Sequence, residues 1–439
     1  MEITIDPNKA ILPLAPVPNL RGALPSWLKI AALSFGGPAG QIALMHRVLV
    51  DEKRWIDDAR FMHALSFCMV LPGPEAMQLA TYCGWIMHGV RGGLLAGTLF
   101  VLPGVLAIMA LSVLYVTFGD ASWTAGLFFG LKAAVLAIVV GALIRIGGKA
   151  LTSNAAKIIA VLAFAALALF AVPFPAVVLA AAIAGWFVLR QPGDPAPVSA
   201  AVKSRTFGIS ALLALLWAGT LAALYFGTGS GSVWTDIGGF FSKLAVVTFG
   251  GAYAVLAYVG QVAVTTKHWL APGEMLDGLG MAETTPGPLV MVLQFVGFLA
   301  AYRNPGGLDP ILAGVLGGLL TSWVTFLPCF LWVFAGAPHI ERLRANKAVS
   351  ASLAGVTAAV VGVIANLALW FGLHFLFGKV EPARFGAMRI EMPVWSSLDL
   401  QASALSALAA FLMLRLKWGV LRVLGTCVVL GMAARLILG

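Results

Sequence analysis

Long apolar stretches occupy most of the chain, and the short connections between them carry most of the charged residues. A helix that crosses about 30 Å of hydrocarbon needs roughly 20 residues. The pattern therefore predicts thirteen membrane segments, some of them longer than one simple crossing. They are 24–50, 57–89, 92–118, 122–148, 155–172, 174–190, 207–227, 234–264, 271–302, 308–336, 350–377, 396–414 and 418–437.

A Pro- and Ala-rich linker, 191–206, follows the sixth predicted segment. One extra segment comes next, and six more follow it. A single added crossing reverses the direction in which the second set enters the membrane, so we expect two inverted repeats, as in many secondary transporters. The predicted fold is an all-α polytopic membrane protein with a tail (1–22), a first repeat (23–190), a linker with the inverting helix (191–233) and a second repeat (234–439).

Two helix-breaking motifs recur in the two halves at a constant offset. Phe35-Gly36-Gly37 returns as Phe249-Gly250-Gly251, and Pro72-Gly73-Pro74 returns as Pro286-Gly287-Pro288, each 214 positions later (249 − 35 = 286 − 72 = 214). A glycine weakens a helix by about 1 kcal/mol and an internal proline by about 3 kcal/mol. We therefore expect a Gly-Gly break and a Pro-Gly-Pro break in each half. Breaks in lipid persist only where the freed backbone groups find partners or line a cavity.

A helix that resumes after a break directs its free amides and its positive dipole end at that break. Pro38 begins such a half-helix, and Ser34 and Thr248 place a hydroxyl beside each Gly-Gly break. These features predict an anion site where the breaks meet. Lys29 and Lys243 precede the breaks by nearly two turns, so each either reaches the site or extends to the headgroups.

Polar side chains near the breaks are further candidates. Glu75 and Glu283 are costly inside a span, and each either carries protons or caps a helix. The glutamines near the breaks either bind a solute or link helices. The predicted substrate-binding residues are Lys29, Ser34, Phe35, Gly36, Gly37, Pro38, Gln41, Pro72, Gly73, Pro74, Glu75, Gln78, Lys243, Thr248, Phe249, Gly250, Gly251, Pro286, Gly287 and Pro288.

Composition agrees with a membrane protein, since 60% of the residues are apolar, 10% are charged and the mean hydropathy is +0.96. The net charge of +10 falls mostly in short connections. On the predicted path the basic loops at 145–157, 190–205, 342–347 and 415–422 share one side, which we expect to be the cytoplasm. The N-terminus is then cytoplasmic and the C-terminus periplasmic, with no cleavable signal in 1–22. The broken segments either cross once or fold back as re-entrant hairpins.

Residues that often mark enzymes and metal sites lack the required spacing. The four cysteines lie inside apolar segments without C-x-x-C spacing, and the histidines near the breaks have no ligand-spaced partners. We expect no metal and no cofactor. The chain lacks the H-E-x-x-H, G-x-S-x-G, phosphate-loop and dinucleotide signatures, which excludes transport driven by its own ATP hydrolysis. It also lacks the basic aromatic patches that bind nucleic acid.

The ordered set of motifs resembles the chromate ion transporter family in its two-domain long form. The resemblance rests on Phe35-Gly36-Gly37-Pro38, Pro72-Gly73-Pro74, Leu102-Pro103-Gly104 and the second copies of the first two. It implies export of chromate from the bacterial cytoplasm, with sulfate as a similar anion and ion gradients as the energy source. The second half departs from the pattern at Ala252 and Cys329, which implies unequal contributions to the site.

We therefore expect a secondary transporter of the bacterial inner membrane that exposes a tetrahedral oxyanion alternately to each side. Its expected partners are chromate, the lipid bilayer and a coupling ion, either a proton or a counter-anion. Sulfate and a homodimer partner are further candidates. The alternatives are an oxyanion channel, an uptake carrier and a membrane enzyme that acts on lipids.

Overall fold

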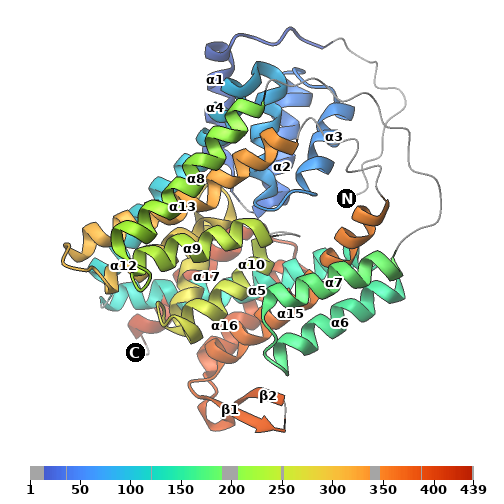
Figure 1. Cartoon of the computed structure of the whole chain (residues 1–439). Coiled ribbons are helices and arrows are strands. Elements are labelled where there is room, and N and C mark those ends of the chain that lie inside the picture. Colours follow the sequence, from blue (N-terminus) through green and yellow to red (C-terminus); the bar gives the residue numbers. More distant parts are fainter. Residues whose placement is uncertain are drawn as a thin grey trace.

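The computed structural model describes residues 14–35, 37–119, 121–189, 206–248, 252–336, 347–386 and 388–437. Nearly all of this is helix, as the apolar pattern predicts (Figure 1). The first half contains α1 (Leu20–Leu33), α2 (Gly37–His46) with a π turn (Arg47–Glu52), α3 (Asp58–Cys68), α4 (Glu75–Phe118), α5 (Ser122–Ala150), α6 (Asn154–Ala168) and α7 (Phe174–Val188).

The second half begins after α8 (Phe207–Thr228), the extra helix that the sequence predicts between the two halves. Its broken helices are α9 (Val233–Val247), α10 (Ala252–Gln261) with a π turn (Val262–Thr266), α11 (Pro272–Thr284), a 3-10 turn (Leu289–Met291) and α12 (Val292–Arg303). The remaining helices are α13 (Pro310–Gly336), α15 (Lys347–Leu376), α16 (Leu400–Ala410) with a π turn (Phe411–Arg415) and α17 (Val420–Ile437).

Five of these helices are long and apolar enough to cross a membrane. Large apolar side chains also cover the outside of the protein, with Phe207 85% and Phe226 84% exposed. Such a surface is stable only in lipid. The protein is therefore a multi-pass membrane protein.

The predicted breaks lie between separate helices. In the first half α1 ends before Ser34 and α2 begins at Gly37, while α3 and α4 are separated by the Pro72-Gly73-Pro74 motif. Gly37 has a φ of +78°, a conformation that glycine adopts at little cost. The Gly-Gly break of the second half falls on Phe249, Gly250 and Gly251, which lie outside the described residues, as does Gly36.

Ion pairs tie together the two arms of three broken segments. One arm precedes the break and the other follows it, so each pair shows that the chain folds back beside itself. The pairs are Lys29–Glu52 at 2.8 Å, Lys267–Asp236 at 2.7 Å and Arg303–Glu274 at 2.6 Å.

Helix α4 also doubles back, at His88 and Gly89, where the backbone leaves the helical conformation. A Cβ on Gly84 would lie 2.4 Å from the carbonyl oxygen of Gly92, so the two parts of α4 touch on either side of this bend. The bend separates the predicted segments 57–89 and 92–118. The part after the bend is long enough to cross the membrane by itself.

A β-hairpin, β1 (Val380–Phe385) and β2 (Met388–Pro393), follows α15 and was not predicted. Its strands are short and mostly exposed, so apolar periodicity gave no strong signal. It projects from one end of the molecule, opposite the end that holds α1 to α3 (Figure 1).

Small residues allow the helices around the breaks to pack closely. A Cβ on Gly130 of α5 would lie 2.1 Å from the Cys427 carbonyl oxygen of α17, and one on Gly185 of α7 would lie 2.4 Å from the Ala351 carbonyl oxygen of α15. Close backbone approach of this kind stabilises helix pairs in membranes. It holds α5 against α17 and α7 against α15.

Candidate functional site

The breaks of the two halves bond to each other through an exchanged pair of backbone hydrogen bonds. The amide of Gly73 donates to the Thr248 carbonyl at 2.8 Å, and the amide of Gly287 donates to the Ser34 carbonyl at 2.9 Å. The two bonds are related by the repeat offset, since 73 + 214 = 287 and 34 + 214 = 248. Each Pro-Gly-Pro break thus satisfies a carbonyl that the opposite Gly-Gly break leaves free.

Glycine is required at the centre of both Pro-Gly-Pro motifs. Gly73 and Gly287 have φ angles of +121° and +106°, in the left-handed region that other residues rarely adopt. A Cβ on Gly73 would lie 2.9 Å from Cys329 Sγ, and one on Gly287 would lie 3.1 Å from the Gly104 Cα. Both the backbone angle and the close packing therefore exclude a side chain.

Gln41 strengthens this junction on one side only. Its side chain is 1% exposed, and Nε2 donates to the Gly287 carbonyl at 2.6 Å and to the Ser34 carbonyl at 3.2 Å. Gln78 is equally buried and donates to the Pro72 carbonyl at 2.7 Å. Among the described residues the Oε1 atoms of both glutamines are buried without a hydrogen-bond partner, so each has an acceptor to offer a solute or water.

Three helix starts border a small pocket at the junction. Its lining comes from the first turns of α2 (Pro38, Gln41), α4 (Pro74, Glu75, Ala76) and the 3-10 turn before α12 (Pro288, Leu289, Val290). The free amides and positive dipole ends of such first turns favour an anion.

The pocket holds about 10 Å³ that water can occupy, close to the space of one water molecule. A tetrahedral oxyanion has four oxygens and needs several times that space. The pocket as it stands is therefore too small for such an anion, which would fit only if the breaks moved apart.

The two predicted hydroxyls lie at the junction, but their protons are already used. Ser34 Oγ donates to the Ile30 carbonyl at 2.6 Å, and Thr248 Oγ1 donates to the Leu244 carbonyl. Both bonds run back into the preceding helix, a common arrangement for hydroxyls in helices. Phe35 is partly buried between the ends of α1 and α2, and Pro286 contacts Gly104 through its carbonyl oxygen.

The two predicted lysines are not brought to the pocket. The Lys29 side chain is 48% exposed and pairs with Glu52, and Lys243 is exposed on α9. A helical side chain leans towards the N-terminus of its own helix. Because both lysines precede their break, this lean carries their side chains away from it. Their spacing from the break along the sequence did not show the direction of the side chains.

The two predicted carboxylates occupy different surroundings. Glu75 is the first residue of α4 and lines the pocket. Glu283 is buried on α11 and accepts a hydrogen bond from Tyr253 Oη at 2.7 Å. The structure therefore brings Glu75 to the pocket and leaves Glu283 paired beside it.

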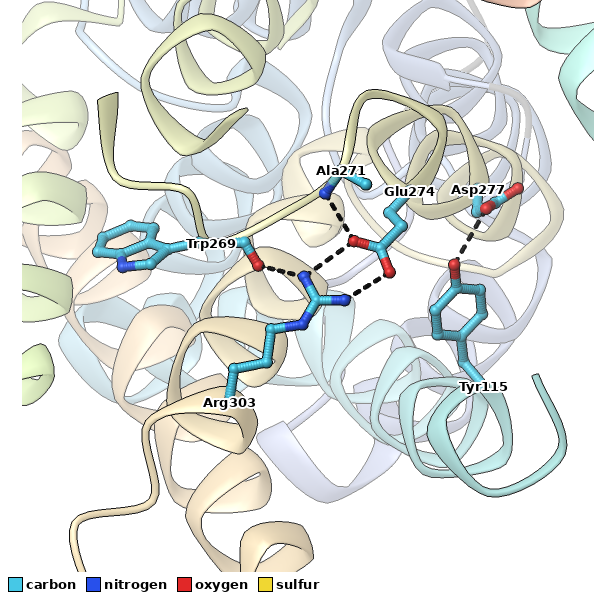
Figure 2. Close-up of polar contacts among 6 residues, drawn as sticks. All are labelled: Tyr115, Trp269, Ala271, Glu274, Asp277 and Arg303. Atoms are coloured by element: carbon cyan, nitrogen blue, oxygen red, sulfur yellow. Dashed lines mark hydrogen bonds and ion pairs between the residues drawn. The ribbon is translucent and has the colours of Figure 1, made fainter. Parts of the chain in front are cut away.

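A second, larger cavity of about 620 Å³ lies between the ends of α4, α5, α11, α12, α15 and α17, and sequence reasoning missed it. Lys132, which the sequence left without a partner, pairs there with Asp277 at 3.2 Å. Tyr115 Oη donates to the other oxygen of Asp277 at 3.1 Å (Figure 2). An acidic residue inside a predicted span was the available signal, because such residues are rare in membranes.

Arg303 and Glu274 form the rim of this cavity. Figure 2 shows the guanidinium of Arg303 facing the Glu274 carboxylate, with bonds of 2.6 and 2.9 Å, and a third bond to the Trp269 carbonyl. Glu274 also accepts from the Ala271 amide and so caps α11. The start of α11 is thereby fixed to the end of α12.

No group of three or more His, Cys, Asp or Glu side chains in the described part of the chain is arranged to hold a metal ion. The four cysteines are buried and unpaired.

Comparison with known proteins agrees with the motif pattern. The family model described as Chromate transporter matches residues 23–186 and 235–432. The Chromate transport protein of Pseudomonas aeruginosa is 35% identical over 344 residues, which is 77% of each chain.

The Chromate transport protein of Cupriavidus metallidurans is 31% identical over 80% of this chain and 82% of its own length. A Probable chromate transport protein of Synechococcus elongatus is 28% identical over 85% of this chain and 91% of its own. These relatives are named as transport proteins and not as enzymes. No solved structure matches significantly. With the family model covering both halves and both kinds of break, this chain belongs to the chromate transporter family.

Proposed function

We propose that the protein is a secondary active transporter that exports chromate across the bacterial inner membrane, by alternating access of a site between the Gly-Gly and Pro-Gly-Pro breaks. The observation that carries this proposal is the exchanged pair of hydrogen bonds, Gly73 to Thr248 and Gly287 to Ser34. It joins the two halves at one point with equivalent bonds. Two equivalent contacts at one site suit a mechanism in which two inverted repeats rock about a fixed site.

The chemistry of the pocket suits an oxyanion. An unpaired ion that enters a medium of low dielectric constant costs tens of kcal/mol, roughly, and a dianion costs more. Three first turns that border one pocket supply backbone amide donors for an anion. We assign the contacts to the amides that follow Pro38, Pro74 and Pro288, with Gln41 and Gln78 as neighbouring polar groups.

The hairpin arms support an inverted arrangement of thirteen segments. Pro18 accepts a hydrogen bond from His88 at 2.7 Å, so the start of α1 and the bend of α4 lie together. The second part of α4 then runs past the junction at Gly104 and reaches the larger cavity at Tyr115. Helix α11 begins at this cavity, and α12 ends there. The hairpins of the two halves would thus enter from opposite sides.

In this topology the loops near Arg54 and Arg91 share a side with the α5–α6 connection, which carries Lys149 and Lys157. An excess of Lys and Arg marks the cytoplasmic side. The N-terminus is then cytoplasmic, while the C-terminus and the larger cavity face the periplasm.

Flux measurements on proteoliposomes test the proposal. Labelled chromate should enter vesicles with saturating kinetics, accelerate when unlabelled chromate is trapped inside, and slow when sulfate competes. Imposed pH gradients and membrane potentials then identify the energy source.

Two results would contradict the proposed carrier. Absence of any chromate flux from a well-folded preparation would remove the function. Unitary currents without trans-acceleration would replace the carrier with a channel.

A further inference from the structure

The larger cavity contains a charged site that the junction does not use, and we call it the vestibule. It is open to the surface, and its 620 Å³ lies within the range of pockets that hold small molecules. Charged and titratable groups face it from every helix around it. They are Tyr115 on α4, Lys132 on α5, Glu274 and Asp277 on α11, Tyr302 and Arg303 on α12, His374 on α15, Asp399 before α16 and Arg435 on α17.

Most of these groups are already neutralised or occupied. Glu274 holds Arg303 through two bonds, and Asp399 accepts from the Gln401 and Ala402 amides at 2.9 Å to cap α16. His374 lies 3.0 Å from the Trp370 carbonyl and 3.8 Å from Glu391. These contacts leave Lys132, Asp277 and Arg435 to set the charge of the vestibule.

Asp277 is the only carboxylate of this set that is almost fully buried, at 3% exposure. Its Oδ2 accepts from Tyr115, while its Oδ1 has the ammonium of Lys132 at 3.2 Å and, within the described chain, no well-formed hydrogen bond. Breaking a buried ion pair is costly while one charge is left without a partner, so a proton on Asp277 would leave Lys132 in need of another anion. Oδ1 is therefore the atom on which a proton would displace Lys132.

Arg435 supplies a second cation at the same cavity. Its guanidinium lies 4.8 Å from the ring centre of Phe129, and no carboxylate in the described chain pairs with it. Once Asp277 is protonated, the vestibule has two uncompensated cations, Lys132 and Arg435. Such a pair in a sheltered cavity is a seat for a dianion.

We propose that the vestibule binds an oxyanion together with one proton, and that this proton accompanies the oxyanion through the transporter. The proton passes from water to Asp277 Oδ1, the Lys132–Asp277 ion pair opens, and Lys132 pairs with the oxyanion instead. Release of the oxyanion lets Asp277 lose its proton and regain Lys132. The inference rests on the proposed function only for the role of this proton in transport.

The vestibule is connected to the junction by two continuous helices. Asp277 lies on α11, which leads directly into Pro286-Gly287-Pro288. Tyr115 lies eleven residues after Gly104 on α4 (115 − 104 = 11), or about 16 Å, and Gly104 packs against the same motif. A change in the Lys132–Asp277 pair therefore acts on the helix that positions the Gly287 amide.

Binding and proton uptake on purified protein in detergent test the proposal without transport. Sulfate is the probe, because it stays a dianion across neutral pH. Wild-type protein should take up about one proton per bound sulfate, and its affinity should fall about tenfold per pH unit above the pKa of Asp277 in the sulfate-free protein. Asp277→Asn should bind sulfate at every pH without proton uptake, and Lys132→Gln should weaken sulfate binding at least tenfold.

Matched variants separate this proposal from a general loss of fold. Asp277→Glu should restore proton uptake, and Asp236→Asn, which removes a partly buried ion pair with Lys267, should behave as wild type. If Asp277→Asn alone does not fold, the double variant Asp277→Asn with Lys132→Gln takes its place, because it removes both charges of the pair and leaves neither one unpaired. It should bind sulfate weakly and take up no proton.

Three results would overturn the proposal. Sulfate binding to wild type without proton uptake is the first, and uptake that persists in Asp277→Asn is the second. The third is loss of uptake in Glu75→Gln but not in Asp277→Asn, which would place the proton at the junction. If wild-type protein moves no chromate but passes these binding tests, the proposed function fails and the vestibule site stands.

Discussion

Helices α3 and α11 occupy the same place in the duplicated unit, since Asp58 + 214 gives Pro272, yet they differ in almost every respect. Helix α11 has an unbroken run of buried residues from Met275 to Glu283 and packs against α4, α5, α12 and α15. Helix α3 buries only Phe61, Ala64, Phe67 and Cys68 and packs mainly on α4.

The difference separates what the repeat shares from what each half adds. The breaks that follow α3 and α11 make the same backbone bonds. The helices before them differ, because the position of α3 that matches Asp277 of α11 is a partly buried histidine, His63. The duplicated motifs thus build the junction, whereas the vestibule depends on Asp277, a carboxylate that the first half does not repeat.

The junction that both halves build is tested most strongly by a substitution that adds a side chain at the centre of either Pro-Gly-Pro motif. Gly73→Ala and Gly287→Ala should each reduce chromate flux in proteoliposomes at least tenfold, because the alanine needs a left-handed backbone, about 1–2 kcal/mol, and overpacks the junction by about 1–3 kcal/mol. Gly148→Ala and Gly239→Ala, where a Cβ meets nothing within 4 Å, are the controls. Equal flux in all four variants would show that the two breaks need not touch.

Gln41 tests the asymmetry inside the junction, because the second half has Val255 at the matching position (41 + 214 = 255). Gln41→Val should lower the free energy of unfolding by about 1–3 kcal/mol, since the Ser34 and Gly287 carbonyls lose a buried donor. Chromate flux should fall several-fold. Val255→Ile, a small apolar change, is the control, and a Gln41→Val protein as stable as wild type would contradict the role given to this side chain.

Leucines at matching positions test the difference in packing between the two helices. Leu279 of α11 is fully buried, and Leu65 of α3 (279 − 214 = 65) is only partly buried. Leu279→Ala should cost about 2–5 kcal/mol and lower the melting temperature in detergent. Leu65→Ala should lower the free energy of unfolding by less than half as much. If the two variants lost the same free energy, Leu65 of α3 would have to be as well buried in the folded protein as Leu279.

The lysines should have the smallest effect. Lys29→Ala removes an ion pair between side chains that are 48% and 39% exposed, which is worth about 0–1 kcal/mol. Lys29→Ala and Lys243→Ala should therefore keep chromate flux within about twofold of wild type. A tenfold loss in either variant at equal expression would return that lysine to the substrate path.

The sequence alone was enough to predict the helical class, the extra helix between the halves and the positions of the breaks. Gly and Pro act on the backbone locally, so Gly37, Gly73 and Gly287 could be interpreted without knowing their neighbours. The crossed pairing of the breaks could not be predicted, because no local feature of Ser34 or Thr248 says which amide will reach its carbonyl.

Side-chain direction and burial were the other limits. Lys29 and Lys243 have the right spacing from the breaks, but their lean along the helix takes them away from it. Lys132 and Asp277 are 145 positions apart (277 − 132 = 145), and only the packing of α11 against α5 brings them together. The fold was therefore easier to predict than the polar sites within it.

The central claim is that an oxyanion binds where the breaks of the two halves meet. The most direct measurement is anomalous scattering at the chromium absorption edge from crystals of the protein soaked with chromate. The account predicts a chromium peak beside the first-turn amides after Pro38, Pro74 and Pro288, with these breaks moved apart to admit it. Absence of chromium from the junction, with the junction closed around its small pocket, would contradict the account even if chromium occupies the vestibule.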